Sequence, residues 1–420
     1  MLKQETIAII KSTVPVLEEH GVAVTKRFYE LLFTNHPELL NLFNHANQKQ
    51  GRQQGALANA VYAAALHIDR LETILPVVKG IAHKHRSLGV KPEHYPVVGE
   101  HLLLAMKDVL GDGATEEVLA AWGDAYQVIA DAFIGVEKSM YEEAEGQHGG
   151  WEGFRAFRVE RRVKESEVIT SFYLEPEDGK AIADFLPGQY VSVKLDIPGE
   201  AYTHIRQYSL SDSPGKPYYR ISVKREEATS EKPEGTASNA LHRYAEEGER
   251  IWLSAPAGQF VLDQDDDRPV VLLSGGVGIT PMMSMLKTLA EAEVVAETKA
   301  GTAKMAIAGA SRPVTFIHAA RNGEFHAMRE QTDELAEAHE HITVYYCYQN
   351  PTEDDRKRNA FHREGFIERE WLELITPGAD AVYYFCGPIP FMKQINQHLK
   401  QLGVPESSIY YEFFGPAGQL

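Results

Sequence analysis

The spacing of apolar residues changes near residue 150, and this change limits the chain to folds that combine a helical part with sheet-forming parts. Up to about residue 145, apolar residues recur three and four positions apart, as on one buried helix face. The stripes are Ile7, Ile10, Val14 and Leu17, then Leu57, Ala60, Val61, Ala64, Ala65 and Ile68, then Val118, Leu119, Trp122, Ala125, Tyr126, Ile129 and Phe133. Helix breaks are predicted at Gly21, 35–37, Pro76, Gly89 and 111–113.

Beyond residue 154 the apolar period becomes two, which is typical of strands. Residues 157–163, 190–195 and 219–224 are predicted strands, and the Pro and Gly turns around them indicate a small antiparallel barrel. The glycine-containing stretch 145–151 is the predicted linker between the helices and this barrel.

From about residue 268, uninterrupted apolar segments alternate with helical ones. Residues 269–273, 314–318 and 382–386 are predicted strands, and 282–293 is a predicted helix. Such alternation is typical of a parallel sheet covered by helices. Residues 293–312 are rich in Ala, Gly, Glu and Lys, and we expect a surface insertion there.

The chain is too long for one hydrophobic core. It has 420 residues, whereas a single core stops growing at roughly 250–300 residues. We therefore predict a multidomain protein with an all-α domain at 1–147, an antiparallel β-barrel domain at 151–265 and an α/β domain with a parallel sheet at 268–420.

Charge and cysteine usage exclude several classes of partner. The formal net charge of -18 would repel phosphate backbones, so we expect no nucleic-acid partner. The two cysteines, Cys347 and Cys386, form no disulfide framework or paired metal motif, which favours a reducing cytoplasm. No signal peptide and no apolar stretch of membrane-spanning length is recognisable. We expect a cytoplasmic monomer.

Three motifs in the second part of the chain carry binding chemistry. The glycine-rich turn after the 269–273 strand lets a backbone approach a pyrophosphate, and the following helix N-terminus supplies N–H donors. Cys386-Gly387-Pro388 ends another strand, and Arg206-Gln207-Tyr208-Ser209 offers a phosphate clamp and a ring for stacking. Each motif alone has a plain structural alternative, namely a tight turn, a small buried side chain or a surface charge.

In this order, the three motifs resemble the ferredoxin–NADP reductase superfamily over roughly residues 151–420. The resemblance implies that FAD and NAD(P)H bind here. FAD would contact Tyr190, Arg206, Gln207, Tyr208 and Ser209. NAD(P)H would contact Gly275, Gly276, Val277, Gly278, Ile279, Thr280, Cys386, Gly387 and Pro388. The tail Glu412, Phe413, Phe414, Gly415 and Pro416 would cover the flavin, although an aromatic tail can also simply complete the sheet.

The helical part contains many histidines, and a lone histidine is usually a solvated side chain. His85 differs because it follows a helix that begins at Pro76 and comes after Phe43, with Tyr29 on an earlier helix. This pattern resembles the bacterial globins. The resemblance implies haem b with His85 as the iron ligand and with Phe43 on the haem face. Tyr29, Gln53 and Leu57 would line the opposite side, where a phenol and an amide can donate hydrogen bonds to O2.

Tyr95 and Glu137 would lie on the same side of the haem as His85 and hydrogen-bond to it. A carboxylate partner makes imidazole a stronger donor to iron. Each residue alone could be an aromatic core residue or an exposed acid. Lys84 is expected to contact the flavin region by pairing with Glu412.

A globin joined to such a reductase resembles the flavohaemoglobins over essentially the whole chain. The resemblance implies a nitric oxide dioxygenase, which converts NO and O2 to nitrate with electrons passed from NADH or NADPH through FAD to haem b. Two alternatives stay open: an oxygen-binding or sensing protein whose reductase keeps iron ferrous, and a general flavin reductase for other acceptors.

Overall fold

The computed structural model describes residues 2–44, 48, 50–230, 233–298 and 312–415. The helical part comes first along the chain. Its elements are α1 (Gln4–Ser12), α2 (Val14–Asn35), η1 (Pro37–Asn41), α4 (Arg52–Leu66), η2 (Leu71–Ile74), α5 (Leu75–Leu88), α6 (His94–Leu110), η3 (Gly111–Gly113) and α7 (Glu116–Gly146). Helix α2 packs on α4 and α6, and α5 packs on α7. The apolar stripes of these helices form one core around Phe28, Leu102 and Trp122.

Two of the predicted boundaries in this part are wrong. Helix α2 continues through Gly21, which lies where α2 meets α4; a Cβ there would make an ordinary contact of 3.6 Å with the Cβ of Ala58. The glycine therefore neither breaks the helix nor is required by the packing. Helix α7 extends to Gly146, so the helix takes the first residues of the predicted 145–151 linker.

The antiparallel barrel predicted after residue 151 is confirmed. Its strands are β1 (Phe154–Lys164), β2 (Ile169–Pro176), β3 (Tyr190–Leu195), β4 (His204–Ser209), β5 (Tyr219–Lys224) and β6 (Arg250–Ser254), with α8 (Thr236–Tyr244) between β5 and β6. They form one sheet in the order β4-β3-β6-β1-β2-β5. A bridge between Leu210 and Ile221 joins the two edges, because the chain beyond β4 pairs with β5. This contact closes the sheet.

The parallel sheet predicted after residue 268 is also confirmed. Its strands are β7 (Val270–Gly275), β8 (Val314–Ala320), β9 (Ile342–Tyr348), β10 (Arg363–Glu364), β11 (Val382–Cys386) and β12 (Ile409–Glu412), in the order β10-β9-β8-β7-β11-β12. The helices are α9 (Ile279–Thr298), α10 (Arg329–Ala338), α11 (Glu353–Lys357), α12 (Arg369–Ile375) and α13 (Ile389–Gln401). Apolar side chains of α9 cover one face of the sheet, and those of α12 and α13 cover the other.

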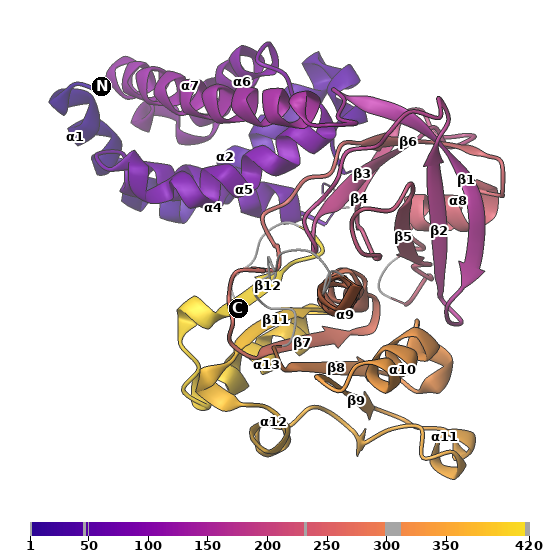
Figure 1. The fold of residues 1–420 in the computed structure, drawn as a ribbon. Coiled ribbons are helices and arrows are strands. Elements are labelled where there is room, and N and C mark those ends of the chain that lie inside the picture. Colours follow the sequence, from indigo (N-terminus) through magenta and orange to yellow (C-terminus); the bar gives the residue numbers. More distant parts are fainter. Residues whose placement is uncertain (1, 45–47, 49, 231–232, 299–311, 416–420) are drawn as a thin grey trace.

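The predicted insertion at 293–312 is partly replaced by helix, because α9 continues to Thr298. Residues 299–311 lie outside the described part of the chain. Within the described residues, no helix is both long and apolar enough to cross a bilayer. In Figure 1 the helical part and the antiparallel sheet lie side by side above the parallel sheet, and β12 runs toward the helices.

Two fully buried histidines lie against each other in the parallel-sheet domain. His318 on β8 and His326 in the following loop have ring centroids 4.5 Å apart. The Ser274 hydroxyl lies 2.8 Å from His318 Nδ1, and the Tyr348 hydroxyl lies 2.8 Å from His326 Nδ1. Neither Nε2 atom has a hydrogen-bond partner among the described residues. Burial lowers the pKa of His318 to about 3, and it holds the pKa of His326 well below its ordinary value.

We predict that the parallel sheet loses stability between pH 7 and pH 5. An unfolded histidine takes up a proton below about pH 6.5, whereas folded His318 does so only near pH 3, so the unfolded state binds more protons in this window. At pH 5 the loss from His318 alone should be about 2 kcal/mol. Hydrogen exchange of β8 at the two pH values, corrected for intrinsic rates, measures it. His318→Asn should flatten the dependence, and an unchanged slope in that variant would contradict the assignment.

Candidate functional site

Three helices bring His85, Tyr95 and Glu137 together. His85 is in the last turn of α5, Tyr95 in the first turn of α6 and Glu137 in the second half of α7. His85 Nδ1 lies 2.7 Å from Glu137 Oε1 and 3.1 Å from the Tyr95 hydroxyl, which itself donates to Glu137 Oε1 at 2.6 Å. Glu137 is 3% exposed, so its carboxylate is satisfied by these two donors rather than by water.

This arrangement determines the tautomer of His85. A carboxylate only accepts hydrogen bonds, so Nδ1 must carry the proton and Nε2 has the free lone pair. Nε2 makes no hydrogen bond to the described residues, and the side chain is 32% exposed. Those residues hold no cluster of three or more His, Cys, Asp or Glu that could enclose a metal ion. The donor set therefore fits a metal that needs one protein ligand, such as haem iron.

Neighbouring side chains hold Tyr95 and His85 in place. The Tyr126 hydroxyl donates to the Tyr95 carbonyl at 2.6 Å, and the Phe133 ring lies 5.8 Å from the His85 ring. Burial and the neighbouring Glu137 carboxylate raise the pKa of Tyr95. Tyr95 therefore stays protonated and can donate its hydrogen bond throughout the neutral range.

A second group of predicted residues lies on α2, on α4 and in the segment that follows η1. The Tyr29 hydroxyl is buried on α2 and hydrogen-bonds to the side chains of Gln53 and Gln48. Burial raises the pKa of Tyr29, which keeps it a neutral donor. The Phe43 and Tyr29 rings pack edge to face with their centroids 5.7 Å apart. Leu57 is half-buried one helical turn after Gln53. Gln48 was not predicted, since nothing in its spacing distinguished it.

The predicted flavin residues lie on two neighbouring strands. In the register of β3 and β4, Tyr190 pairs with Ser209 and Val191 pairs with Tyr208. The Tyr190 hydroxyl is buried and makes no hydrogen bond of normal geometry within the described residues. Within the described residues the Arg206 guanidinium has one acceptor, the Ile205 carbonyl at 2.7 Å, and burial lowers its pKa. A buried phenol without a hydrogen bond of normal geometry on β3 and a buried cation on β4 fit a large polar ligand such as FAD.

The glycines of the two strand-end motifs lie against each other. A Cβ on Gly278 would collide with the carbonyl of Cys386, and one on Gly387 would lie 2.7 Å from the Phe391 ring. Gly275 faces the same ring, with a Cβ position 3.1 Å away. The Phe391 ring therefore packs on Gly275 and Gly387, and the turn at Gly278 approaches the end of β11 closely. Only glycine permits this approach of the two strand ends, which is the kind of place where a parallel sheet binds a phosphate-bearing ligand.

The other residues of these motifs contribute through the backbone. Gly276 has a φ of 53°, a left-handed conformation that glycine adopts without strain. Val277 packs on the core, and the Thr280 hydroxyl donates to its carbonyl at 3.1 Å. The side chains of Ile279 and Cys386 are fully buried, and burial raises the pKa of Cys386. Pro388 immediately precedes α13.

The C-terminal strand meets the other two parts of the chain at a cavity of about 410 Å³. It is lined by Lys84 of α5, by Gln259 and Phe260 beyond β6, and by Ile409, Tyr410, Tyr411, Glu412, Phe413 and Gly415. Phe414 is 46% exposed, and Pro416 lies outside the described residues.

The predicted pairing of Lys84 with Glu412 is found as an attraction without direct contact: the charge of each partly offsets the effect of burial on the pKa of the other. The Lys84 ammonium donates to the Gly415 carbonyl at 2.9 Å, and it forms no ion pair with Glu412 within the described residues. Burial lowers the pKa of Lys84 and raises that of Glu412. The main-chain acceptor was inaccessible to sequence reasoning, because the path of the tail decides which oxygen reaches the ammonium.

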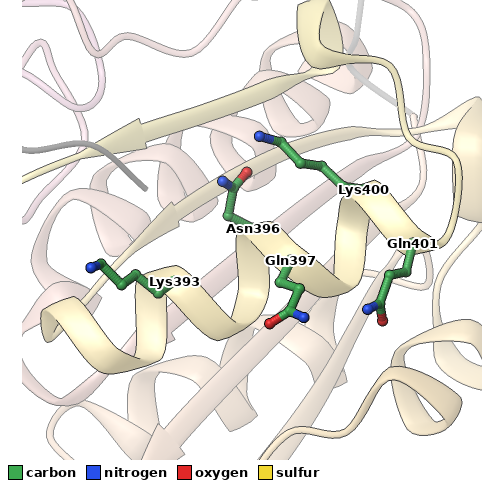
Figure 2. A pocket seen from close by; sticks show the side chains of 5 residues that line it. All are labelled: Lys393, Asn396, Gln397, Lys400 and Gln401. Atoms are coloured by element: carbon green, nitrogen blue, oxygen red, sulfur yellow. The ribbon is translucent and has the colours of Figure 1, made fainter.

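A further hollow of about 490 Å³ lies along α13 and is lined by Lys393, Asn396, Gln397, Lys400 and Gln401 (Figure 2). These side chains come from one helix and point in different directions. No acid, base or nucleophile pair converges there, so we place the functional site at the junction described above.

Sequence reasoning also missed the contacts between α5 and the antiparallel sheet. His83, Arg86 and Ser87 reach Gly258, Pro256 and Ser192, respectively. The only signal was a run of polar residues on a helix that should be half-buried, and such a run is as common on a solvated face.

Comparison with protein families assigns each part of the chain. Residues 26–133 match the globin family, residues 156–262 match the oxidoreductase FAD-binding domain, and residues 272–397 match the oxidoreductase NAD-binding domain.

Full-length relatives carry all three parts in the same order. The chain is 58% identical over 420 residues to a flavohemoprotein of Bacillus thuringiensis subsp. konkukian, with complete coverage of both chains. It is 51% identical to the flavohemoprotein of Bacillus subtilis over 99% of this chain and 98% of that protein. Among solved structures, a flavohemoglobin from Malassezia yamatoensis with bound FAD and heme aligns with a TM-score of 0.83 and 26% identity, covering 99% of this chain and all of that one. The FAD/NAD-binding domain of a nitric oxide dioxygenase from Vibrio cholerae is 37% identical with a TM-score of 0.53, covering 62% of this chain and 99% of that one.

We predict that Gly278→Ala weakens NADH binding and destabilises the parallel-sheet domain. The added methyl would overlap the Cys386 carbonyl, which belongs to a central strand and cannot move freely. Overpacking of this kind costs about 1–3 kcal/mol. Thermal unfolding and a fluorescence titration with NADH measure the two effects. Gly135→Ala is the matched control, because a Cβ on this helical glycine meets nothing within 4 Å. Equal behaviour of the two variants would refute the prediction.

Proposed function

Because this chain belongs to the flavohaemoglobin family, we propose that it is a nitric oxide dioxygenase that converts NO and O2 to nitrate with electrons from NAD(P)H, and so removes nitric oxide. The family assignment makes it an oxidoreductase with haem, FAD and NAD-binding parts. The observation that carries the finer proposal is the hydrogen bonding of His85 to the buried Glu137 carboxylate, in a chain that also holds its own reductase. The name of the Vibrio cholerae relative supports the same reaction.

When bound, FAD accepts an electron pair from NAD(P)H and releases electrons singly, and haem iron accepts single electrons and binds O2. His85 would hold the iron through Nε2. Glu137 keeps the Nδ1 proton of His85 in place, and Tyr95 orients the carboxylate by donating to the same oxygen. This partial transfer of negative charge to the imidazole favours activation of O2 over its storage.

Tyr29 and Gln53 would act on the opposite side of the haem. Both can donate hydrogen bonds, and Tyr29 is buried among Phe28, Phe33 and Phe43. A donor in such an apolar, water-poor environment stabilises developing negative charge more strongly than it would in water. Leu57 on α4 would limit which molecules reach the O2-binding side of the haem.

The residues of the two sheet domains would bind and orient FAD and NAD(P)H. Arg206 would neutralise FAD phosphate charge, Tyr190 and Tyr208 would contact the flavin, and Ser209 would hold its polar edge. The apposed glycines of β7 and β11 would admit the pyrophosphate of NAD(P)H. Lys84 ties the C-terminal tail to the helical domain through Gly415.

The direct test is nitric oxide consumption by the purified holoprotein in aerated buffer, followed with an electrode before and after NADH is added. We expect rapid loss that requires NADH and O2 and yields nitrate. His85→Ala should abolish this loss and leave NADH oxidation by artificial flavin acceptors intact, while His20→Ala, at an exposed position, should change neither. Removal of nitric oxide by His85→Ala would refute the haem mechanism. No stimulation by NADH would favour oxygen binding or a general reductase.

Glu137→Gln should lower the nitric oxide turnover by about ten- to a hundredfold, the usual cost of losing a partner of a metal ligand. The substitution keeps the shape of the side chain but removes its charge. The iron–histidine stretching frequency in resonance Raman spectra of the ferrous protein should fall as well. Glu142→Gln, an exposed acid on the same helix, is the matched control. Unchanged frequency and turnover in Glu137→Gln would show that the carboxylate only fills space.

A further inference from the structure

The helix that carries His85 is fastened to the antiparallel sheet on its other side. Gly80, His83 and Ser87 are spaced three and four apart, which places them on the face of α5 opposite His85. This face packs on β3 and on the chain beyond β6. Gly80 leaves room for Gln259, whose Nε2 would lie 2.7 Å from a Cβ at this position. His83 Nδ1 accepts a hydrogen bond from the Gly258 N–H at 3.3 Å.

Arg86 makes the charged contact of this interface. It is 7% exposed, and its guanidinium donates a short hydrogen bond to the Pro256 carbonyl. It forms no ion pair with the described residues; burial lowers its pKa, and Tyr190, Tyr141 and Glu143 partly offset this effect. The Tyr141 hydroxyl of α7 donates to the Val90 carbonyl at 2.8 Å and lies 3.3 Å from the Arg86 carbonyl, so α7 contacts the end of α5 while the barrel domain holds the Arg86 side chain. Within the described residues, the buried Arg86 side chain has one hydrogen-bond acceptor, a carbonyl across the domain boundary. Burying such a cation is costly unless that boundary stays closed.

Ser87 begins a chain of hydroxyl contacts that leads to the flavin motif. Ser192 Oγ on β3 donates to Ser87 Oγ at 2.9 Å, and Gln207 Nε2 donates to Ser192 Oγ at 3.3 Å. Ser87 and Ser192 are both fully buried. Gln207 belongs to the Arg206–Ser209 segment, so one residue, Arg86, separates the predicted iron ligand His85 from Ser87, where this hydrogen-bonded path to the predicted flavin strand begins.

We propose that Arg86 and the Ser87–Ser192 pair are positioning residues for electron transfer between the domains: they hold the helix bearing His85 against the strands that carry the flavin motif. The inference rests on the route from FAD to haem within the proposed function, but not on nitric oxide chemistry. NADH supplies two electrons to FAD, and each electron that leaves the flavin reduces one ferric iron to ferrous. Opening of this interface lengthens the path of that second step and leaves the first unchanged.

The test uses the full-length holoprotein without oxygen or nitric oxide. Stopped-flow absorbance after mixing with excess NADH separates reduction of the flavin from reduction of the haem. Arg86→Met should slow haem reduction about tenfold, as expected for loss of one charge-assisted hydrogen bond that favours the closed interface. Flavin reduction and cofactor content should not change. Arg86→Lys, which can still donate to Pro256, should recover most of the rate.

Hydrogen exchange gives a readout that does not depend on turnover. In Arg86→Met the segment 255–260 should exchange faster, while β7 and β11 should not. Lys79→Met is the matched control, because it removes a positive charge from an exposed position of the same helix. Ser192→Ala tests the hydroxyl path independently and should also slow only haem reduction.

Haem reduction at the wild-type rate in both Arg86→Met and Ser192→Ala would overturn the inference. A parallel fall in both reduction steps, or loss of a cofactor, would also overturn it, since it would indicate general destabilisation. If the holoprotein does not remove nitric oxide but its haem reduction still depends on Arg86, the proposed function is refuted and the positioning role is supported.

Discussion

The hydrogen bond between His85 Nδ1 and the buried carboxylate of Glu137 determines how α5 is rotated in the molecule. With Nδ1 facing α7, Nε2 is left for a ligand, and the opposite face of α5 is left for the antiparallel sheet. Helical geometry links these two outcomes, because residues three and four apart share a face. One polar contact in the helical domain therefore sets both the ligand side and the docking side of the same helix.

Buried charges also join the two sheets. Lys287 on α9 donates to Asp212 beyond β4 at 2.9 Å, and Arg220 on β5 donates to Gln331 on α10 at 2.8 Å. Removing such groups from water is costly, and the gain comes only when every partner is in place. These contacts are stabilising in one relative orientation of the sheets, which is the orientation that brings the β3–β4 strands and the strand-end glycines to the same side of the molecule as the C-terminal tail.

The fold was largely readable from apolar periodicity. The strands Tyr190–Leu195, Tyr219–Lys224 and Val382–Cys386 have the predicted bounds, because their flanks are turn-forming residues and their interiors are β-branched or aromatic. Periodicity failed where packing overrides local preference. Gly21 lies inside α2, whose long apolar face packs on α4 and α6, and α9 continues into the segment expected to be an insertion.

The sequence by itself determined the three kinds of architecture, their order and the strand-end glycine motifs, because these depend on residue spacing and local backbone freedom. Only the tertiary structure decided which groups meet. Lys84 bonds to the Gly415 carbonyl instead of Glu412, Arg86 reaches Pro256, and Ser87 meets Ser192, although 105 to 331 positions separate these partners in the sequence. Pairings of this kind depend on helix rotation and on the docking of whole domains, which no local pattern encodes.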